Sequence, residues 1–386
     1  MLNVLFLGAF PPQFLINRSN GRIDSRYRAS EALIKGLRNH EDVYLKVITS
    51  PDIVSYPKGP FYIKKEYNAN EDLTLVSSLN IQFLKQIWTI LSMISEARKY
   101  IKQCNGKVAV IIPYLVFRHV LTLRLLHFFY PQKVVQISVV PDIFFPQKTL
   151  HRYVNRRTEK MASKFDFFVF YTQKMAEYLS IPKERFVVIE GFRDIPNREP
   201  QSVNDVFKVV YAGLLQVNYG ITRLIEAMEF IREPDVQLHL YGDGNAKVFI
   251  EQAAKCDSRI IFHGSVSNEE SIEAIYSASA LINPRNSNDG EYVEYSFPSK
   301  DIQYMATGIP TLLCKLPSMP EEYYGYFIDM GDASPEQIAL SIMRVKKMKC
   351  EQRKAFGERS RIFISDRMDY NRQASKIISH IESLVS

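Results

Sequence analysis

Short apolar runs alternate with helix-length amphipathic segments along the whole chain, and this alternation limits the fold more than any other feature. It is the pattern of βαβ units, in which parallel strands form a sheet and the connecting helices cover its faces. Each half of the chain holds enough apolar runs for a sheet of its own. The sequence therefore predicts an α/β protein with two Rossmann-like domains. The predicted strands are residues 3–8, 44–49, 108–112, 134–139, 167–171 and 186–189, then 208–212, 237–241, 260–263, 280–283, 311–314 and 326–328.

A polar segment without periodicity separates the two halves. Residues 195–206 contain two prolines, which is typical of an interdomain linker. We therefore expect a first domain at 1–194 and a second at 207–369. Two helices are predicted near the end, at 335–347 and 370–385. The second sheet does not need the last of them, so we expect residues 370–386 to cross back to the first domain.

Composition narrows the class of protein. Apolar residues make up 46% of the chain and charged residues 24%, which is typical of a globular protein and excludes long disorder. The four cysteines are widely spaced and form no CxxC pair, so neither a zinc site nor a disulfide framework is expected. No run of eighteen apolar residues and no basic leader occurs. We therefore expect a reduced, cytoplasmic protein.

Charge is distributed unevenly between the halves. Residues 1–194 hold 28 Lys and Arg against 16 Asp and Glu, whereas the remainder holds 21 against 26. A basic half favours nucleic acid, an anionic membrane surface or a phosphorylated substrate. No recognition helix or series of interleaved aromatics is recognisable, so nucleic acid is the weakest of the three.

Motifs for nicotinamide, ATP and metal chemistry are missing. A dehydrogenase would carry G-x-G-x-x-G after its first strand, but Gly8 is followed by Ala-Phe-Pro-Pro. The one Gly-x-Gly, at 242–244, lacks the third glycine, and no P-loop lysine motif is present. The seven histidines show no paired ligand spacing, so neither a metal nor a resident cofactor is expected.

A polar loop in the second half carries the densest group of chemically active side chains. It runs from Asn283, at a predicted strand end, to a predicted helix start at Pro298. The N-terminus of such a helix binds anions through free N–H groups, and Ser299 with Lys300 adds a hydroxyl and an ammonium. The alternative is a solvated surface lysine at an ordinary helix start. Asp301, one position further on, is expected to point away from the anion.

Five motifs in the second half occur in register over about residues 207–310. They are Tyr211-Ala-Gly213, Leu224-Ile-Glu-Ala227, Tyr241-Gly-Asp-Gly244, Phe262-His-Gly-Ser-Val266 and Tyr304-Met-Ala-Thr-Gly-Ile-Pro310. Together they resemble the GT-B glycosyltransferases, specifically the retaining enzymes of family 4. The loop Tyr-Ser-Phe-Pro-Ser-Lys at 295–300 is similar to that of a bacterial subgroup that builds surface polysaccharides. The resemblance implies two domains that face each other across a cleft, with the donor nucleotide sugar on the second and the acceptor on the first.

The resemblance also implies site residues, with departures. The family has two glutamates, one touching the donor sugar and one the ribose. In this chain Tyr295 occupies the position of the first glutamate, with Glu294 beside it, and Gln303 occupies the position of the second glutamate. Leu214 and Tyr219 replace a common cation pair, which leaves Lys300 and Arg285 to neutralise the diphosphate. The expected catalytic residues are Lys300, Arg285 and Glu294, and the expected donor-binding residues are Gly8, Gly213, Tyr219, Gly242, Val266, Asn288, Ser296, Phe297, Pro298, Ser299 and Gln303.

Candidates in the first domain face the acceptor in this interpretation. Residues 17–28 hold four arginines, among them Arg22 and Arg26, which suit a phosphate-bearing acceptor or form an ordinary solvated charge run. Asp142 follows an apolar strand and would orient an acceptor hydroxyl or cap a helix. Apolar residues at helical spacing between 81 and 94, and a stretch at 114–130, are more typical of core faces than of membrane anchors.

The resemblance implies a metal-independent hexosyl- or N-acetylhexosaminyltransferase that retains the anomeric configuration. Its donor would be a nucleotide diphosphate sugar, UDP-linked by preference, and its acceptor a saccharide or polyprenyl-linked saccharide in polysaccharide biosynthesis. The basic first domain would hold it peripherally on an anionic membrane. Two alternatives remain: a nucleotide-sugar epimerase on the same fold, and a catalytically silent subunit that binds a partner or membrane.

Overall fold

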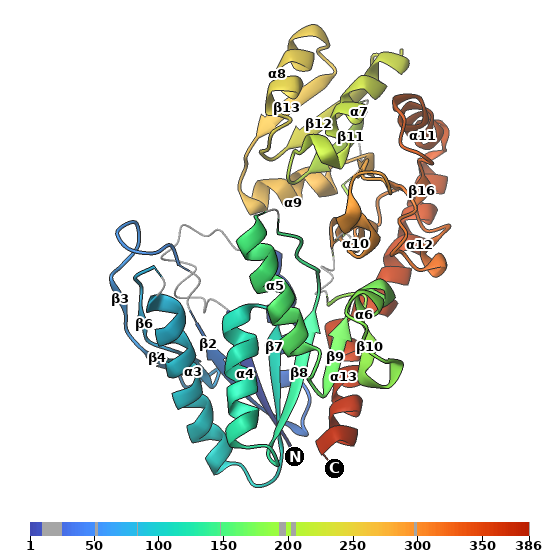
Figure 1. Cartoon of the computed structure of the whole chain (residues 1–386). Coiled ribbons are helices and arrows are strands. Elements are labelled where there is room, and N and C mark those ends of the chain that lie inside the picture. The colour runs from blue at the N-terminus through green and yellow to red at the C-terminus, as the bar shows by residue number, and fades with distance from the viewer. Residues whose placement is uncertain are drawn as a thin grey trace. The chain divides into compact units, whose positions relative to one another are not determined.

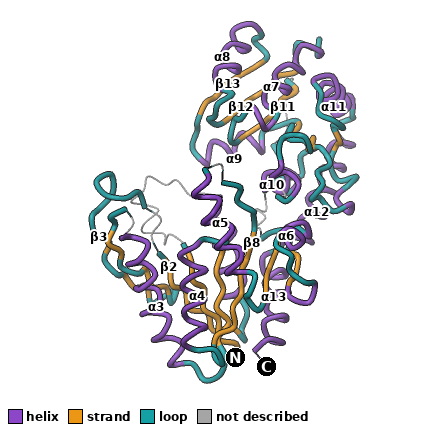
Figure 2. Tube along the Cα trace, viewed as in Figure 1, coloured by secondary structure: helices purple, strands orange, loops and turns teal. Residues whose placement is uncertain are grey.

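The structure is a computed structural model that describes residues 1–9, 25–50, 53–82, 84–146, 148–192, 198–201, 206–296 and 299–385, without the side chains of 25–28 and 291. The chain divides into two compact units: unit 1 is Met1–Asp194 with Met368–Ser386, and unit 2 is Ile195–Arg367. Of the predicted linker, residues 198–201 and 206 are described. The predicted α/β class with parallel sheets is confirmed in both units (Figures 1 and 2).

Unit 1 is built on a mostly parallel sheet, whose described strands follow the order β10-β9-β8-β7-β1-β2-β5-β4, with β4 antiparallel to β5. A separate antiparallel pair joins β3 to β6. The elements are β1 Leu2–Gly8, α2 Ser25–Arg38, β2 Val43–Thr49, β3 Tyr62–Ile63, β4 Glu66–Asn68, β5 Leu73–Leu75, β6 Ser78–Leu79, α3 Leu84–Gln103, β7 Val108–Pro113, α4 Phe117–Phe129, β8 Val134–Val140, α5 Thr149–Ala162, β9 Phe167–Phe170, α6 Gln173–Tyr178, η1 Lys183–Arg185, β10 Phe186–Val188 and the C-terminal α13 Tyr370–Val385.

Both faces of the unit 1 sheet are covered, as a parallel sheet requires. Along β1, Val4 and Phe6 pack in one cluster with residues of α2 and α13, whereas the alternating Leu5 and Leu7 are also fully buried. Helices α3, α4 and α5 lie side by side (Figure 1). Helix α13 packs against α2, so the chain's last helix completes the core of the first unit.

Unit 2 holds a parallel sheet of described order β13-β12-β11-β14-β15-β16. Val209 and Tyr211 of β11 pack with α7, α8 and α11, and Val210 and Ala212 pack with α9 and α10, so both faces are covered here as well. The elements are β11 Phe207–Ala212, η2 Val217–Tyr219, α7 Ile221–Glu226, η3 Ala227–Phe230, β12 Val236–Tyr241, α8 Lys247–Cys256, β13 Ile260–Gly264, α9 Asn268–Tyr276, β14 Ala280–Ile282, η4 Glu291–Glu294, α10 Ser299–Met305, β15 Thr311–Leu313, η5 Glu321–Tyr323, β16 Ile328–Asp329, α11 Pro335–Lys347 and α12 Cys350–Met368.

Eleven of the twelve predicted strands agree with the structure to within one residue at each end, and the predicted helices at 335–347 and 370–385 are α11 and α13. The strand predicted at 326–328 is misplaced along the sequence, because β16 spans Ile328–Asp329. Strands β3 to β6 and helix α12 were not predicted. No helix in the described ranges is both long and apolar enough to span a bilayer.

We expect Gly36→Ala to destabilise unit 1, although alanine favours helices over glycine by about 1 kcal/mol. A Cβ at Gly36 of α2 would lie 2.5 Å from the Tyr370 carbonyl oxygen and 2.7 Å from the Ala374 Cβ of α13. The resulting overpacking should lower the free energy of unfolding by about 1–3 kcal/mol. Urea unfolding followed by the emission of Trp88, the sole tryptophan, reports on this unit.

The matched control is Glu31→Ala, an exposed position on the same helix, which should change the free energy of unfolding by less than about 0.5 kcal/mol. If Gly36→Ala instead raised the free energy of unfolding by the roughly 1 kcal/mol by which alanine favours a helix over glycine, α13 would not pack against α2 as described.

Candidate functional site

The carboxyl ends of β11 and β12 in unit 2 lie unusually close together, and glycines make this possible. The Gly213 N–H donates to the Tyr241 carbonyl at 2.8 Å, and the Gly242 N–H donates to the Gly264 carbonyl at 2.7 Å. A Cβ on Gly242 would lie 1.8 Å from the Gly213 carbonyl oxygen. Both glycines have positive φ, a region where side chains are strained. These predicted donor-site glycines therefore shape the strand ends.

Lys300 reaches from the first turn of α10 to the end of β11. Its ammonium donates to the Ala212 carbonyl and lies 4.1 Å from the centroid of the Tyr211 ring. A Cβ on Gly213 would lie 1.5 Å from Nζ, so a side chain there would displace the ammonium. Burial lowers the pKa of Lys300 to about 7, and the nearby Asp301 only partly opposes the shift. No described carboxylate lies within ion-pair distance of this ammonium.

Asp301 does not point away from the strand ends, so that prediction was wrong. Its side chain is buried, and one carboxylate oxygen accepts a 2.6 Å hydrogen bond from the Asn283 amide at the end of β14. Burial raises the pKa of Asp301 to about 6. The Asn283 to Asp301 bond thus fixes the start of α10 against the end of β14.

Arg285 lies between aromatic rings in the polar loop. Its guanidinium carbon is 4.3 Å from the centroid of Tyr292 and 5.8 Å from that of Tyr219. One Nη donates to the Ser296 hydroxyl at 3.1 Å, and the buried Nε has no hydrogen-bond partner among the described residues. Arg285 therefore resembles Lys300, because both are held by neutral groups.

A second arginine, Arg223 of α7, holds the loop in place. It makes two 3.0 Å bonds to the two carboxylate oxygens of Asp289 and donates to the Pro284 carbonyl. Asp289 also accepts from the Asn286 N–H, and the Asn286 amide donates to the Asp332 carbonyl. Sequence reasoning missed these residues, since no local spacing links Arg223 to a loop sixty residues further on.

The other predicted donor-side residues lie in the polar loop, on α10 or after β13. Gln303 is half-buried on α10, Glu294 is exposed at the end of η4, and Ser299 is exposed at the start of α10. Asn288 is exposed, with its N–H donating to Asn286, and Val266 packs against the cluster that contains Tyr241. Phe297 and Pro298 lie outside the described residues.

The predicted residues of unit 1 have simpler surroundings. A Cβ on Gly8 would lie 2.5 Å from the Pro113 ring of β7, so close strand packing favours glycine at this position. Asp142 is exposed after β8 and accepts from the Ile143 N–H, and it caps no helix because α5 begins at Thr149. Arg22 and the side chain of Arg26 lie outside the described residues. Within the described ranges, no group of His, Cys, Asp or Glu is placed to hold a metal ion.

Solved structures with the same architecture define the class as the GT-B fold of glycosyltransferases. Sucrose-phosphate synthase from Thermosynechococcus elongatus matches at a TM-score of 0.64, 14% identity and 99% coverage of both chains. The lipopolysaccharide outer core galactosyltransferase WaaB matches at 0.65, 13% and 99% of both. An E. coli trehalose-6-phosphate protein bound with UDP-2-fluoro glucose matches at 0.66, 10% and 98% of both.

The family comparison points to unit 2. Residues 206–347, a little over a third of the chain, match the family described as Glycosyl transferases group 1. No curated protein matches the chain significantly. The matched segment contains Gly213, Arg285 and Lys300, so it includes the strand ends described above and supports a glycosyltransferase domain there.

Lys300→Met should raise the stability of the unliganded protein at pH 6. The folded chain loses the Lys300 proton near pH 7 and the unfolded chain near 10.5, so between these values the unfolded state binds more protons. The wild type consequently gains stability as pH rises through this window, and the advantage of the variant shrinks. Thermal unfolding from pH 6 to 10 measures the difference.

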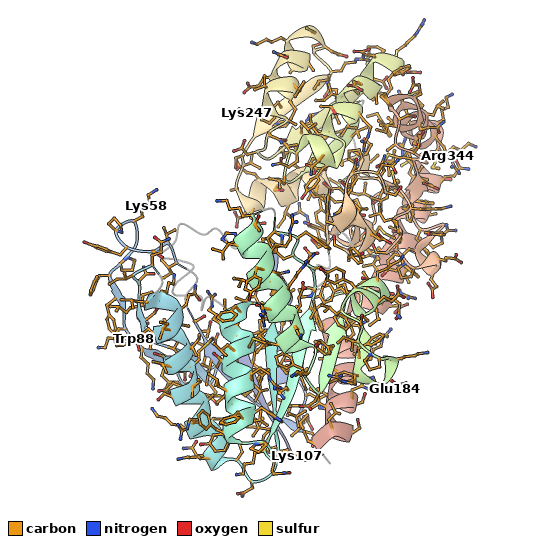
Figure 3. The ribbon with its side chains drawn as sticks, viewed as in Figure 1. Lys58, Trp88, Lys107, Glu184, Lys247 and Arg344 are labelled. Atoms are coloured by element: carbon orange, nitrogen blue, oxygen red, sulfur yellow. The ribbon has the colours of Figure 1, made fainter. Side chains whose placement is uncertain are left out.

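The control is Lys247→Met, an exposed position on α8 (Figure 3), which should change the free energy of unfolding by less than about 0.5 kcal/mol. A flat difference for Lys300→Met would mean that the Lys300 ammonium is not desolvated.

Proposed function

We propose that the protein transfers a hexosyl or N-acetylhexosaminyl unit from a nucleotide diphosphate sugar, UDP-linked by preference, to a saccharide or polyprenyl-linked saccharide. We also propose that the anomeric configuration is retained and that no metal takes part. The family match in unit 2 and the GT-B fold support transfer from a nucleotide sugar. The relatives that carry a galactosyltransferase name or a bound UDP-sugar analogue agree with this donor class.

The observation that carries the proposal is a pair of cations, Lys300 and Arg285, in the segment at the strand ends of unit 2. Neither has a carboxylate partner among the residues that the structure describes. Ligands of open α/β sheets bind at the carboxyl ends of the strands. As the glycosidic bond breaks, the leaving diphosphate gains negative charge, and preorganised positive groups stabilise that charge most where water is excluded. Lys300 and Arg285 are proposed as these groups.

We propose roles for the remaining residues of the loop and of α10 as well. Ser296 orients Arg285 through its hydroxyl, and the exposed Ser299 offers a hydroxyl at the start of α10. Gln303 would bind ribose through its amide, and Glu294 would contact the donor sugar. We propose that the acceptor is presented at the cytoplasmic face of a membrane in polysaccharide assembly.

A thermal-shift screen over UDP, GDP, ADP and their sugars tests the donor class, because a ligand that binds only the folded state raises the melting temperature. Nucleotide release from each donor, with and without saccharide acceptors, then tests transfer. A sugar changed while still attached to its nucleotide would indicate an epimerase instead. Donor binding without release would indicate the silent subunit that Gln303, in place of a glutamate, also permits.

Lys300→Ala should lower kcat about a hundredfold or more, about 3 kcal/mol, with a smaller effect on acceptor binding. The reason is that the contact strengthens as the diphosphate gains charge, so its loss appears mainly in the transition state. Lys300→Arg should recover only part of the rate, since a planar fork does not replace a compact charge. Steady-state kinetics with the donor found in the screen measure both.

Lys247→Ala replaces an exposed lysine of the same unit and should keep the wild-type rate. Asp301→Asn is unsuitable as a control because the Asp301 side chain is buried and accepts a hydrogen bond from the Asn283 amide. Full kcat in Lys300→Ala would rule out the proposed diphosphate contact.

A further inference from the structure

Helix α3 of unit 1 is apolar on two sides. Met93, Ile94, Ala97 and Ile101 face the core and are buried. A second series, Leu84, Ile87, Trp88 and Leu91, follows the same helical spacing but is 48%, 58%, 40% and 61% exposed. The sequence favoured a core face for this helix, and the structure shows that four of its ten apolar residues are exposed instead.

Exposed aromatic side chains on and beside the small β3–β6 pair add to this stripe. Tyr62 of β3 contacts Trp88 edge to face at 6.5 Å, and Phe61 contacts Tyr56 in the same manner at 5.7 Å. All three of these tyrosine and phenylalanine side chains are about half exposed. We call the set Tyr56, Phe61, Tyr62, Leu84, Ile87, Trp88 and Leu91 the aromatic patch. It lies at one flank of unit 1, where β3, β6 and α3 are labelled (Figure 1).

Lysines border the aromatic patch. Lys58 follows Tyr56 in an exposed turn, and Lys64 follows the strand that carries Tyr62. Neither has a described carboxylate partner, whereas Lys65 is paired with Glu96 at 2.7 Å. Figure 3 shows Lys58 and Trp88 on the same flank of the unit. Glu66 is the acidic neighbour in this stretch, so the border is net positive.

We infer that the aromatic patch is a membrane-docking surface that inserts shallowly into the interface of an anionic lipid bilayer. Tyrosine and tryptophan rings with one apolar and one polar end are enriched at bilayer interfaces. Lysines at the border attract anionic headgroups, and the excess of 28 basic over 16 acidic residues in 1–194 adds to this attraction. A second copy of the chain is a poorer occupant because it would bring the same lysines together.

This surface is separate from the donor site, since it lies in unit 1 and the candidate site in unit 2. Docking on a bilayer would raise the local concentration of a lipid-linked acceptor. Binding to vesicles is measured without donor or acceptor, so a negative result leaves the proposed transfer reaction standing.

The sole tryptophan gives a direct readout, because Trp88 lies within the patch. The full chain is mixed with vesicles of phosphatidylcholine alone or of phosphatidylcholine with phosphatidylglycerol. With anionic vesicles, Trp88 emission should shift to shorter wavelength and be quenched by brominated acyl chains. Binding should fall with salt, since charges are screened over about 10 Å at 0.1 M.

Two variants separate the apolar and charged contributions. Ile87→Ser with Leu91→Ser should weaken partitioning at least about tenfold, and Lys58→Glu with Lys64→Glu should weaken it at least about fivefold per lysine. All four side chains are exposed, so folding should be unchanged by circular dichroism. The matched control is Phe249→Ser, an equally exposed apolar residue on α8 of unit 2, which should bind like the wild type.

Three outcomes would overturn the inference. One is Trp88 emission that does not respond to anionic vesicles, and another is equal weakening by Phe249→Ser. The third is a dimer in solution that the Ile87→Ser and Leu91→Ser variant converts to a monomer, because the patch would then bind a second copy.

Discussion

The candidate site of unit 2 depends on the close approach of three chain segments at Gly213. The absence of a side chain there leaves room for the Lys300 ammonium, which is fixed by the Ala212 carbonyl just before it. The Gly213 carbonyl in turn lies where a Cβ of Gly242 would be, so the neighbouring strand end must also be glycine. Tyr304 adds a hydroxyl that accepts the Ala212 N–H at 2.8 Å. One strand end therefore positions α10, its lysine and the adjacent turn.

Most of the fold could be predicted because its signals are local. Buried parallel strands are continuous apolar runs, which are visible in the sequence. Helix α11 begins after a Ser334 cap followed by proline, so a few neighbouring residues determine where it starts. Strands β3 and β6 have two residues each, too short for any period. Helix α12 was missed because its apolar residues do not gather on one face. This helix begins in unit 2, and its last residue, Met368, belongs to unit 1.

The site could be predicted only in part. The sequence singled out the loop, Lys300 and Arg285 as candidates, because a strand end followed by polar residues and a helix start is a local pattern. Local patterns do not show which side of a short helix is buried, so the hydrogen bond from Asn283 to Asp301 was not expected. They also do not show that α3 has two apolar sides, because helical spacing is the same for a core face and an exposed face.

Cations in unit 2 differ in their partners. Arg223, Arg259 and Lys346 are partly buried and each holds a carboxylate within about 3 Å, at Asp289, Asp257 and Asp235. Such pairs offset the cost of removing a charge from water. Lys300 and Arg285 have a carbonyl, a hydroxyl and aromatic faces instead, in a half of the chain with more acidic than basic residues. Arg353 also has only a carbonyl and an aromatic ring among its described partners, but it lies on α12 and not at the strand ends. Neutral partners compensate a desolvated cation less well, and the lowered pKa of Lys300 expresses that cost. An anionic ligand would remove it, which is the physical basis of our proposal that the donor diphosphate binds at these two side chains.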